Sequence, residues 1–227
     1  MANRPVFIAK KEYPFYEIVD VEFEFYNGVA VSQKQKSIKS LHNAFLEINS
    51  SKQLLEVSSK ADDSNGVMLS AFNMKVSMGD KAISLESSFQ GSKKFVNGGP
   101  YTDVYELQPW EAKKDKRLKE SGELIKFVFG GKEFCNEPKD FFYNWIYIKA
   151  LREMSEYKSI LERYDAFTDI EFNPKKSINC QAKAMAIACG LYSAGLLDEC
   201  LKSEHFFYRV YITKSTLKNL NSWICFR

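Results

Sequence analysis

The sequence lacks the short motifs that mark the common nucleotide-binding and hydrolytic enzymes. It contains no GxGxxG, GxxxxGK[ST], GxSxG or HExxH pattern. The dinucleotide-binding, P-loop, serine-hydrolase and zinc-protease classes therefore have no support. Cysteine and histidine are also scarce, with 5 Cys, no CxxC pair and 2 His. A disulfide framework or a zinc site is not expected, and no metal or cofactor is predicted.

Long apolar runs are missing as well. No stretch reaches the roughly 18 apolar residues of a membrane span, and the first 16 residues lack the apolar centre of a signal peptide. The net charge is only +3, from 32 basic and 29 acidic residues, which is too small a bias to indicate nucleic-acid binding by itself. We expect a cytoplasmic protein without membrane contact.

The chain does contain enough apolar side chain for a substantial core, because 45% of its 227 residues are hydrophobic and 15% are aromatic. The polar, turn-rich run SSKADDSNG at residues 58–66 is the best internal boundary. About 60 residues seldom form an independent core. The sequence therefore predicts an α+β protein in which an extension, residues 1–66, packs on a mainly helical domain, residues 67–227.

The extension is predicted to have a ββα arrangement. Residues 5–31 indicate strands, and VDVEFEFYNGVAV alternates apolar with acidic residues, as expected of a half-buried hairpin with its tight turn at Asn27-Gly28. Residues 32–48 follow as an amphipathic helix whose apolar positions recur every three or four residues, at Ile38, Leu41, Phe45 and Ile48.

Four further helices and a C-terminal strand are predicted in the main domain. Ser84 is a suitable N-cap for a helix over 84–95, and Pro109 suits the first turn of one over 109–118. Residues 138–154 indicate a helix with a buried aromatic face, and residues 177–192 one rich in alanine. The run HFFYRVYI at 205–212 indicates a strand. The core aromatic positions of the third helix are Phe141, Phe142, Trp145 and Tyr147.

One candidate site is a polar stripe within the predicted helix 84–95. Glu86, Gln90 and Lys93 stand at positions i, i+4 and i+7, so they project from one helix face. A carboxylate can activate water or hold a sugar hydroxyl, and a lysine can stabilise an oxyanion or attack a carbonyl. A solvated face with an ordinary ion pair would give the same pattern.

A second group of polar residues lies in the segment 164–184. Asp165, Asp169, Asn179 and Gln181 crowd a loop that leads into a small-residue helix. Helix N-termini bind phosphate, and two lysines stand just before this one. A capped helix start with a polar loop would look the same.

Taken together, these segments resemble the NADAR superfamily, whose best-known members are the YbiA-like N-glycosidases. The elements that carry the resemblance are SAFN at 70–73, Glu86 with Gln90 and Lys93, and PWEAK at 109–113. Their order and spacing agree with the family over roughly residues 67–195. The family's Ser-Asn-Phe element here has Asn after Phe, and its Asp-x-x-Trp-Gly run is present as Asp165-Ala-Phe-Thr.

Four longer stretches are similar to a narrower group, the DarT-associated NADAR antitoxins (DarG-type). They are QKQKSIKSLH at 33–42, ESSFQGSKKFVNGGPYTDVY at 86–105, FFYNWIYIKAL at 141–151 and YDAFTDIEFNPKKSINCQA at 164–182. The resemblance implies a DNA ADP-ribosylglycohydrolase antitoxin that removes ADP-ribose from guanine and so reverses a toxin. The implied partners are ADP-ribosylated DNA, or RNA, and the cognate ADP-ribosyltransferase toxin.

The expected catalytic residues are Glu86, Lys93 and Asp165. Glu86 would stabilise the cationic sugar carbon or activate water. Lys93 would pair with Glu86 or a phosphate, or its neutral amine would capture ring-opened ribose as a Schiff base, which requires burial to depress its pKa. The expected substrate-binding residues are Ser70, Phe72, Asn73, Gln90, Trp145, Asp169, Asn179 and Gln181.

The candidates for contact with the DNA backbone are Lys34, Lys36, Lys39, Lys113, Lys114, Lys116 and Arg117. Solvated helix faces would explain these basic residues equally well. Two other functions remain open at this point. One is an N-glycosidase acting on a small riboflavin-pathway phosphate, and the other is a non-catalytic module that binds ADP-ribose or the toxin.

Overall fold

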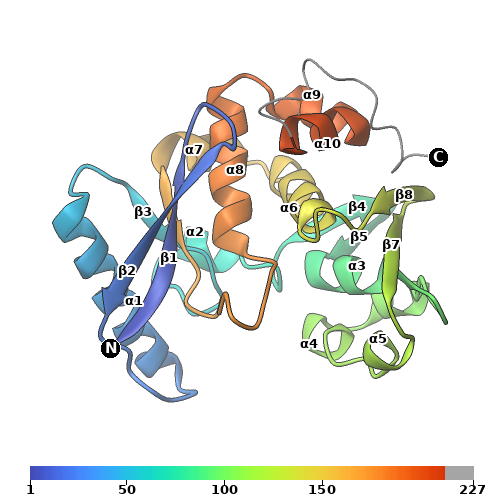
Figure 1. Cartoon of the computed structure of the whole chain (residues 1–227), viewed down its shortest axis with the longest axis horizontal. Helices are drawn as coiled ribbons and strands as arrows, with labels where there is room; N and C mark the ends of the chain where they lie inside the picture. Colours follow the sequence, from blue (N-terminus) through green and yellow to red (C-terminus); the bar gives the residue numbers. More distant parts are fainter. Residues whose placement is uncertain (213–227) are drawn as a thin grey trace. The chain divides into compact units, whose positions relative to one another are not determined.

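The computed structural model describes residues 1–212 and contains two compact units (Figure 1). The first unit consists of residues 1–70 and 155–198, and the described part of the second consists of residues 71–154 and 199–212. Contacts thus group residues 155–198 with the N-terminal residues. The division after residue 66 stays a prediction about which parts fold independently.

The first unit contains a four-stranded sheet with the order β2-β1-β9-β3. Its strands are β1 (Ala2–Ala9), β2 (Tyr16–Phe23), β3 (Leu54–Glu56) and β9 (Ala166–Thr168). β1 is antiparallel to β2 and β9, whereas β3 runs parallel to β9. The hairpin closes over residues 10–15, so the prediction of its turn at Asn27-Gly28 is wrong. The alternating residues of β2 pair with β1, and Asn27 and Gly28 lie in the loop that leads to the next helix.

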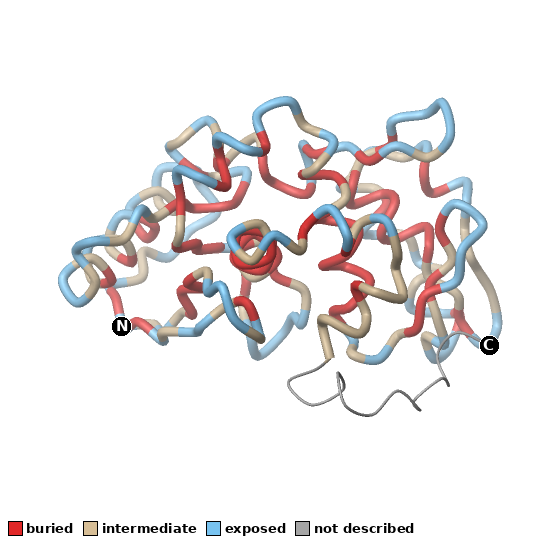
Figure 2. Tube along the Cα trace, turned by 90° about the horizontal axis from the view of Figure 1, so that it is seen from above, coloured by how far each residue is buried: buried red, intermediate tan, exposed pale blue. Residues whose placement is uncertain are grey.

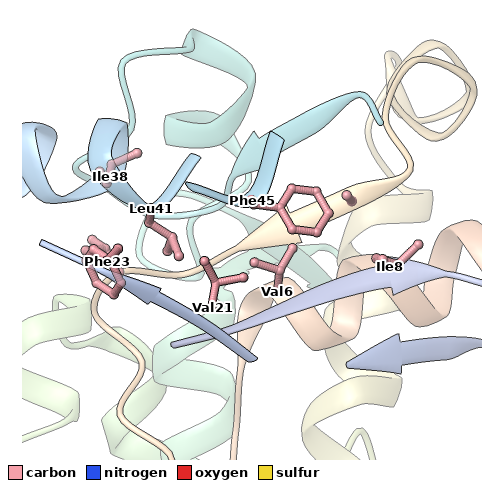
Figure 3. Packing of buried hydrophobic residues seen from close by; sticks show 9 residues of the cluster. Val6, Ile8, Val21, Phe23, Ile38, Leu41 and Phe45 are labelled. Atoms are coloured by element: carbon pink, nitrogen blue, oxygen red, sulfur yellow. The ribbon is translucent and has the colours of Figure 1, made fainter. Parts of the chain in front are cut away.

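Helix α1 (Val31–Ile48) confirms the predicted amphipathic helix. Ile38, Leu41 and Phe45 are buried against the sheet, whereas Ile48, at the helix end, is 64% exposed. Figure 3 shows the side chains of α1 packed against those of β1 and β2. The cluster consists of Val6, Ile8, Val21, Phe23, Ile38, Leu41, Phe45, Ala166 and Ile170.

Helix α8 (Gln181–Ser193) also packs on β1 and β9. Val6, Phe7 and Ile8 are all buried, and successive strand residues point to opposite faces, so both faces of the sheet are covered. The helix approaches very closely: a Cβ at Gly190 would lie 2.4 Å from the carbonyl oxygens of Lys10 and Phe15. The predicted helix over 177–192 is confirmed, with its start at Gln181.

Two short helices complete this part of the chain. α7 (Tyr157–Arg163) packs on α8. α2 (Ser64–Met68) begins inside the predicted loop 58–66, because the Asp63 carboxylate accepts a hydrogen bond from the backbone N–H of Asn65 at 2.8 Å and caps the helix. The chain then passes from the first unit to the second within α9 (Leu197–Lys202).

The second unit combines a hairpin, a three-stranded antiparallel sheet and several helices. The hairpin is β4 (Lys75–Met78) with β5 (Lys81–Ser84), and the sheet is β6 (Lys93–Phe95), β7 (Leu124–Phe129) and β8 (Lys132–Cys135). The helices are α3 (Leu85–Gly91), the 3-10 helix η1 (Thr102–Glu106), α4 (Pro109–Ala112), α5 (Arg117–Glu120), α6 (Phe141–Arg152) and α10 (Glu204–Ile212). Figure 2 shows the buried residues along the Cα trace.

Aromatic rings form the core of the second unit. The Phe142 ring of α6 lies 4.6 Å from Phe127 and 4.8 Å from Phe134, measured between centroids. Trp145 lies 4.6 Å from Phe134 and is 6% exposed. The predicted buried aromatic face of residues 138–154 is therefore confirmed.

Three predicted elements in this unit are wrong. The helix over 84–95 ends at Gly91, because Lys93 pairs with Phe127 of β7. The helix over 109–118 is split into α4 and α5, where the Asp115 carboxylate accepts from the Arg117 N–H at 2.9 Å. The expected C-terminal strand is helix α10, whose buried Phe207 stacks on Phe141 at 5.6 Å. None of the helices within residues 1–212 is long and apolar enough to cross a membrane.

Candidate functional site

Helix α3 carries the first part of the candidate site. The Ser84 hydroxyl accepts from the backbone N–H of Ser87 at 3.1 Å and so starts the helix. All residues from 85 to 91 are buried. Glu86 and Gln90 are only 5% and 6% exposed. These polar side chains therefore do not belong to a solvated helix face.

Glu86, Gln90 and Lys93 form a continuous hydrogen-bonded chain. The Gln90 Nε2 donates to Glu86 Oε1 at 2.8 Å, and the Lys93 Nζ donates to Gln90 Oε1 at 2.6 Å. The two neighbours fix the orientation of the amide, since a carboxylate needs a donor and an ammonium needs an acceptor. Among the described residues there is no direct ion pair between Lys93 and Glu86. Gln90 thus separates the two charges.

Lys93 stands on strand β6, just beyond the helix, and is partly buried. Burial lowers its pKa to about 8, an effect that the negative charge of Glu86 opposes and the positive charge of Lys113 reinforces. A larger share of Lys93 is therefore uncharged near neutral pH than of an ordinary lysine. This is the protonation behaviour that a nucleophilic amine requires.

An aromatic ring and the SAFN element lie next to this hydrogen-bonded chain. The Lys93 Nζ lies 4.8 Å from the centroid of the Phe89 ring, a cation–π contact. The backbone of the SAFN element is also close, because the Ala71 carbonyl accepts from the Glu86 N–H at 3.2 Å. Phe72 and Asn73 follow it and are exposed. Phe72 and Asn73, predicted to bind substrate, thus lie beside the start of α3.

Two other predicted substrate contacts are buried. Ser70 is 3% exposed, and its N–H donates to the Val67 carbonyl at 3.1 Å. The Trp145 ring is packed in the aromatic core described above, and its Nε1 has no hydrogen-bond partner within the described residues. Ring stacking of Trp145 on a nucleobase therefore stays a prediction.

Asp165 has structural partners in the first unit. One oxygen accepts from Lys52 Nζ at 2.9 Å and the other from the backbone N–H of Gln53 at 2.9 Å. Its side chain is 43% exposed. The predicted role as a second catalytic carboxylate stays untested, and these contacts give Asp165 a second function, which is to hold the chain ahead of β3.

The structure brings Asp169 and Gln181 together at the start of α8. Gln181 Nε2 donates to Asp169 Oδ2 at 3.1 Å, and the backbone N–H groups of Glu171 and Phe172 donate to Oδ1. Burial nevertheless raises the pKa of Asp169 to about 6. Asn179 lies in the same loop, and its Oδ1 is buried without a partner among the described residues.

The sequence analysis missed a buried carboxyl group next to Asp169. Glu56 is 3% exposed and accepts from Thr168 Oγ1 at 2.6 Å and from the Ile170 N–H at 2.8 Å. Burial raises the pKa of Glu56 to about 7, and the charge of Asp169 adds to this. His42 Nε2 lies 2.8 Å from the same Thr168 hydroxyl, and burial lowers the pKa of His42 to about 4. The signal available in the sequence was one acidic residue inside the apolar run LLEV.

Glu56 should make the free energy of unfolding depend on pH. Because its pKa rises from 4.5 to about 7 on folding, its contribution to stability is complete below pH 4.5 and is lost as the pH rises to about 7. We expect Glu56→Gln to reduce this decline, since glutamine cannot ionise and Thr168 can turn its hydroxyl to accept from the amide. Thermal unfolding from pH 4 to 8 measures the effect. Glu106→Gln, at an exposed position, is the control. If stability changed with pH equally in both variants, Glu56 would not be the source of the decline.

The basic residues that were predicted to contact DNA differ in their surroundings. Lys34 pairs with Glu171 at 3.2 Å, and Arg117 is bound to the carboxylates of Asp103 and Asp115 at 2.7 and 2.6 Å. Lys113 and Lys114 are exposed and make cation–π contacts with Phe72 and Trp110, respectively.

Comparison with known proteins identifies the family of the chain. No curated protein matches the chain. The model of one family, described as DarT1-associated NADAR antitoxin, matches residues 2–221, which is nearly the whole chain. The resemblance to the NADAR superfamily, and to its DarT-associated group, is confirmed, and the chain belongs to the DarT1-associated NADAR antitoxin family.

Proposed function

We propose that this protein hydrolyses the N-glycosidic bond between ADP-ribose and a nucleobase, guanine in DNA, and thereby reverses the action of a DarT1-type toxin. The observation that carries this proposal is the buried chain from Glu86 through Gln90 to Lys93, in which the lysine has a pKa of about 8. A carboxylate can stabilise positive charge on the sugar carbon, and a partly uncharged amine can attack it. The Gln90 amide holds both groups, which suits cleavage of the N-glycosidic bond.

Glu86 acts on the anomeric carbon of the ribose in this proposal. As the ribose ring opens, that carbon gains positive charge, which a nearby carboxylate stabilises. The same carboxylate then takes a proton from the water that hydrolyses the imine formed on Lys93. Gln90 holds Glu86 through a hydrogen bond to one carboxylate oxygen, Oε1.

Lys93 supplies the nucleophile. Opening of the ribose ring breaks the bond between C1 and the ring oxygen, which takes a proton from solvent, and leaves the base joined to C1 through an iminium. The neutral amine of Lys93 adds to C1. The added amine gives up a proton, with which the base departs, and this leaves a Schiff base between Lys93 and ADP-ribose. Water hydrolyses this imine, restores the amine and releases ADP-ribose. Burial of Lys93 makes the neutral amine available near neutral pH.

The assay that tests the proposal offers three substrates to the purified protein: an ADP-ribosylated DNA oligonucleotide, its RNA counterpart and a riboflavin-pathway phosphate. Products are identified by liquid chromatography and mass spectrometry. We expect free ADP-ribose and an unmodified guanine from the DNA. Turnover of the small phosphate alone, or binding of ADP-ribosylated DNA without release, would contradict the proposal.

A further inference from the structure

Two aromatic side chains are exposed on the surface of the second unit around α4. Phe72 is 37% exposed and Trp110 is 54% exposed. Within residues 1–212 these are the Phe and Trp side chains that remain exposed. Their exposed ring faces can contact a partner.

Each of the two rings has a lysine over it. Lys113 Nζ lies 5.4 Å from the Phe72 centroid, and Lys114 Nζ lies 5.9 Å from the Trp110 centroid. Neither lysine forms an ion pair with a carboxylate in the described part of the chain. Their positive charges are therefore available to an anionic partner.

The acidic residues on either side of these lysines are already engaged. Arg117 binds the carboxylates of both Asp103 and Asp115. Glu111 accepts from the backbone N–H of Gln108 at 3.1 Å and so caps α4. These contacts direct the three carboxylates to other partners, so the ammonium groups of Lys113 and Lys114 keep no carboxylate of their own beside the two exposed rings.

This surface is connected to the candidate site. The charge of Lys113 contributes to the lowered pKa of Lys93, so the two amines lie within electrostatic reach of each other. Phe72 follows Ala71, whose carbonyl accepts from the Glu86 N–H. A nucleic-acid strand that crosses α4 would therefore reach the residues proposed to break the glycosidic bond.

We propose that Phe72, Trp110, Lys113 and Lys114, the α4 surface, bind the single-stranded nucleic acid on either side of the modified base. This proposal rests on the proposed function. Bases stack on the exposed rings and the lysines contact the phosphates. A duplex does not fit these contacts, because its base faces are covered by their neighbours. Stacking and phosphate contacts do not depend on sequence, so the α4 surface positions the strand without selecting it.

Binding of an unmodified, fluorescently labelled single strand tests the proposal by anisotropy. Trp110→Ala should weaken binding about 5- to 100-fold, as expected for the loss of one stacked base. Trp110→Phe keeps an aromatic face, so it should bind much as the wild type does. It should also lose most of the tryptophan quenching that the strand causes in the wild-type protein.

The two lysines are tested by salt dependence. Lys113→Ala/Lys114→Ala should weaken binding and reduce the slope of log K against log salt by about 1.4, or about 0.7 for each phosphate contact. The control Lys75→Ala/Lys139→Ala removes two exposed lysines elsewhere in the same unit and should leave the slope unchanged. An unchanged slope in the Lys113/Lys114 variant, or normal binding by Trp110→Ala, would overturn the proposal.

A comparison of single-stranded DNA, single-stranded RNA and a duplex tests whether the α4 surface prefers single strands. Single-stranded DNA and RNA of one sequence should bind similarly, and a duplex should bind more weakly. A duplex that binds as tightly as the single strand would overturn the α4 surface as a single-strand site. Because the probe carries no ADP-ribose, the result does not depend on catalysis. A protein that binds single strands through Trp110 but releases no ADP-ribose would refute the proposed function alone.

Discussion

Glu86→Gln should lower the rate of ADP-ribose release by about 10²–10⁴ while leaving the fold intact, which is the usual cost of removing a positioned acid–base group. The glutamine has nearly the volume of the glutamate, and its carbonyl can still accept from Gln90 Nε2. It cannot take a proton from water or stabilise a cationic sugar carbon. Single-turnover assays on ADP-ribosylated DNA measure the loss.

Glu86→Ala should be equally inactive but less stable. It leaves the Gln90 amide without its buried partner, at a cost of about 1–3 kcal/mol. Glu106→Ala is the matched control, because Glu106 forms an exposed pair with Lys81 in the same unit. Circular dichroism and thermal unfolding check the fold. A folded Glu86→Gln protein with wild-type activity would remove Glu86 from the mechanism.

Borohydride added during turnover should trap an ADP-ribosyl adduct on Lys93. Reduction of the imine makes the bond permanent, and peptide mass spectrometry locates it. Lys93→Arg should be inactive and give no adduct, because the guanidinium stays protonated at any working pH. The rate of the wild-type protein should rise with pH and level off above about 8, as the amine of Lys93 loses its proton.

An electrostatic role of Lys93 predicts a different pattern. Lys93→Arg would keep part of the activity, Lys93→Ala would lose more, and the wild-type protein would give no adduct. Lys94 is the internal control. The two lysines are consecutive on strand β6, so their side chains point to opposite faces of the sheet. An adduct on Lys94, or full activity in Lys93→Ala, would show that Lys93 and its face of the sheet are not the site.

The sequence predicted the polar stripe on α3 more accurately than it predicted the secondary structure around it. Glu86 and Gln90 meet because they are one helical turn apart, which periodicity alone provides. Lys93 reaches Gln90 from a strand, although the prediction placed it on the same helix. The local pattern could not show where the helix ends, since this depends on pairing with Phe127, more than 30 residues away.

The C-terminal run HFFYRVYI illustrates the same limit. Its aromatic and β-branched residues favour a strand, yet it forms α10 because Phe207 and its neighbours pack on Phe141 of α6. Tertiary packing overrides propensity in such short segments. Helix α1 was predicted within one residue because its apolar stripe is long and is decided by its own sequence.

The central position of β9 has a consequence for synthesis on the ribosome. β9 lies between β1 and β3, but Thr168 follows Glu56 by 112 positions. The β1–β2 hairpin and β3 are therefore translated long before the strand that joins them, and residues 71–154 of the second unit emerge in the interval. Until then, the facing edges of β1 and β3 are unpaired strand edges of the kind that promote aggregation. Slow translation before residue 166 would prolong that exposure, so a nascent chain stalled there should depend on chaperones more than one released later.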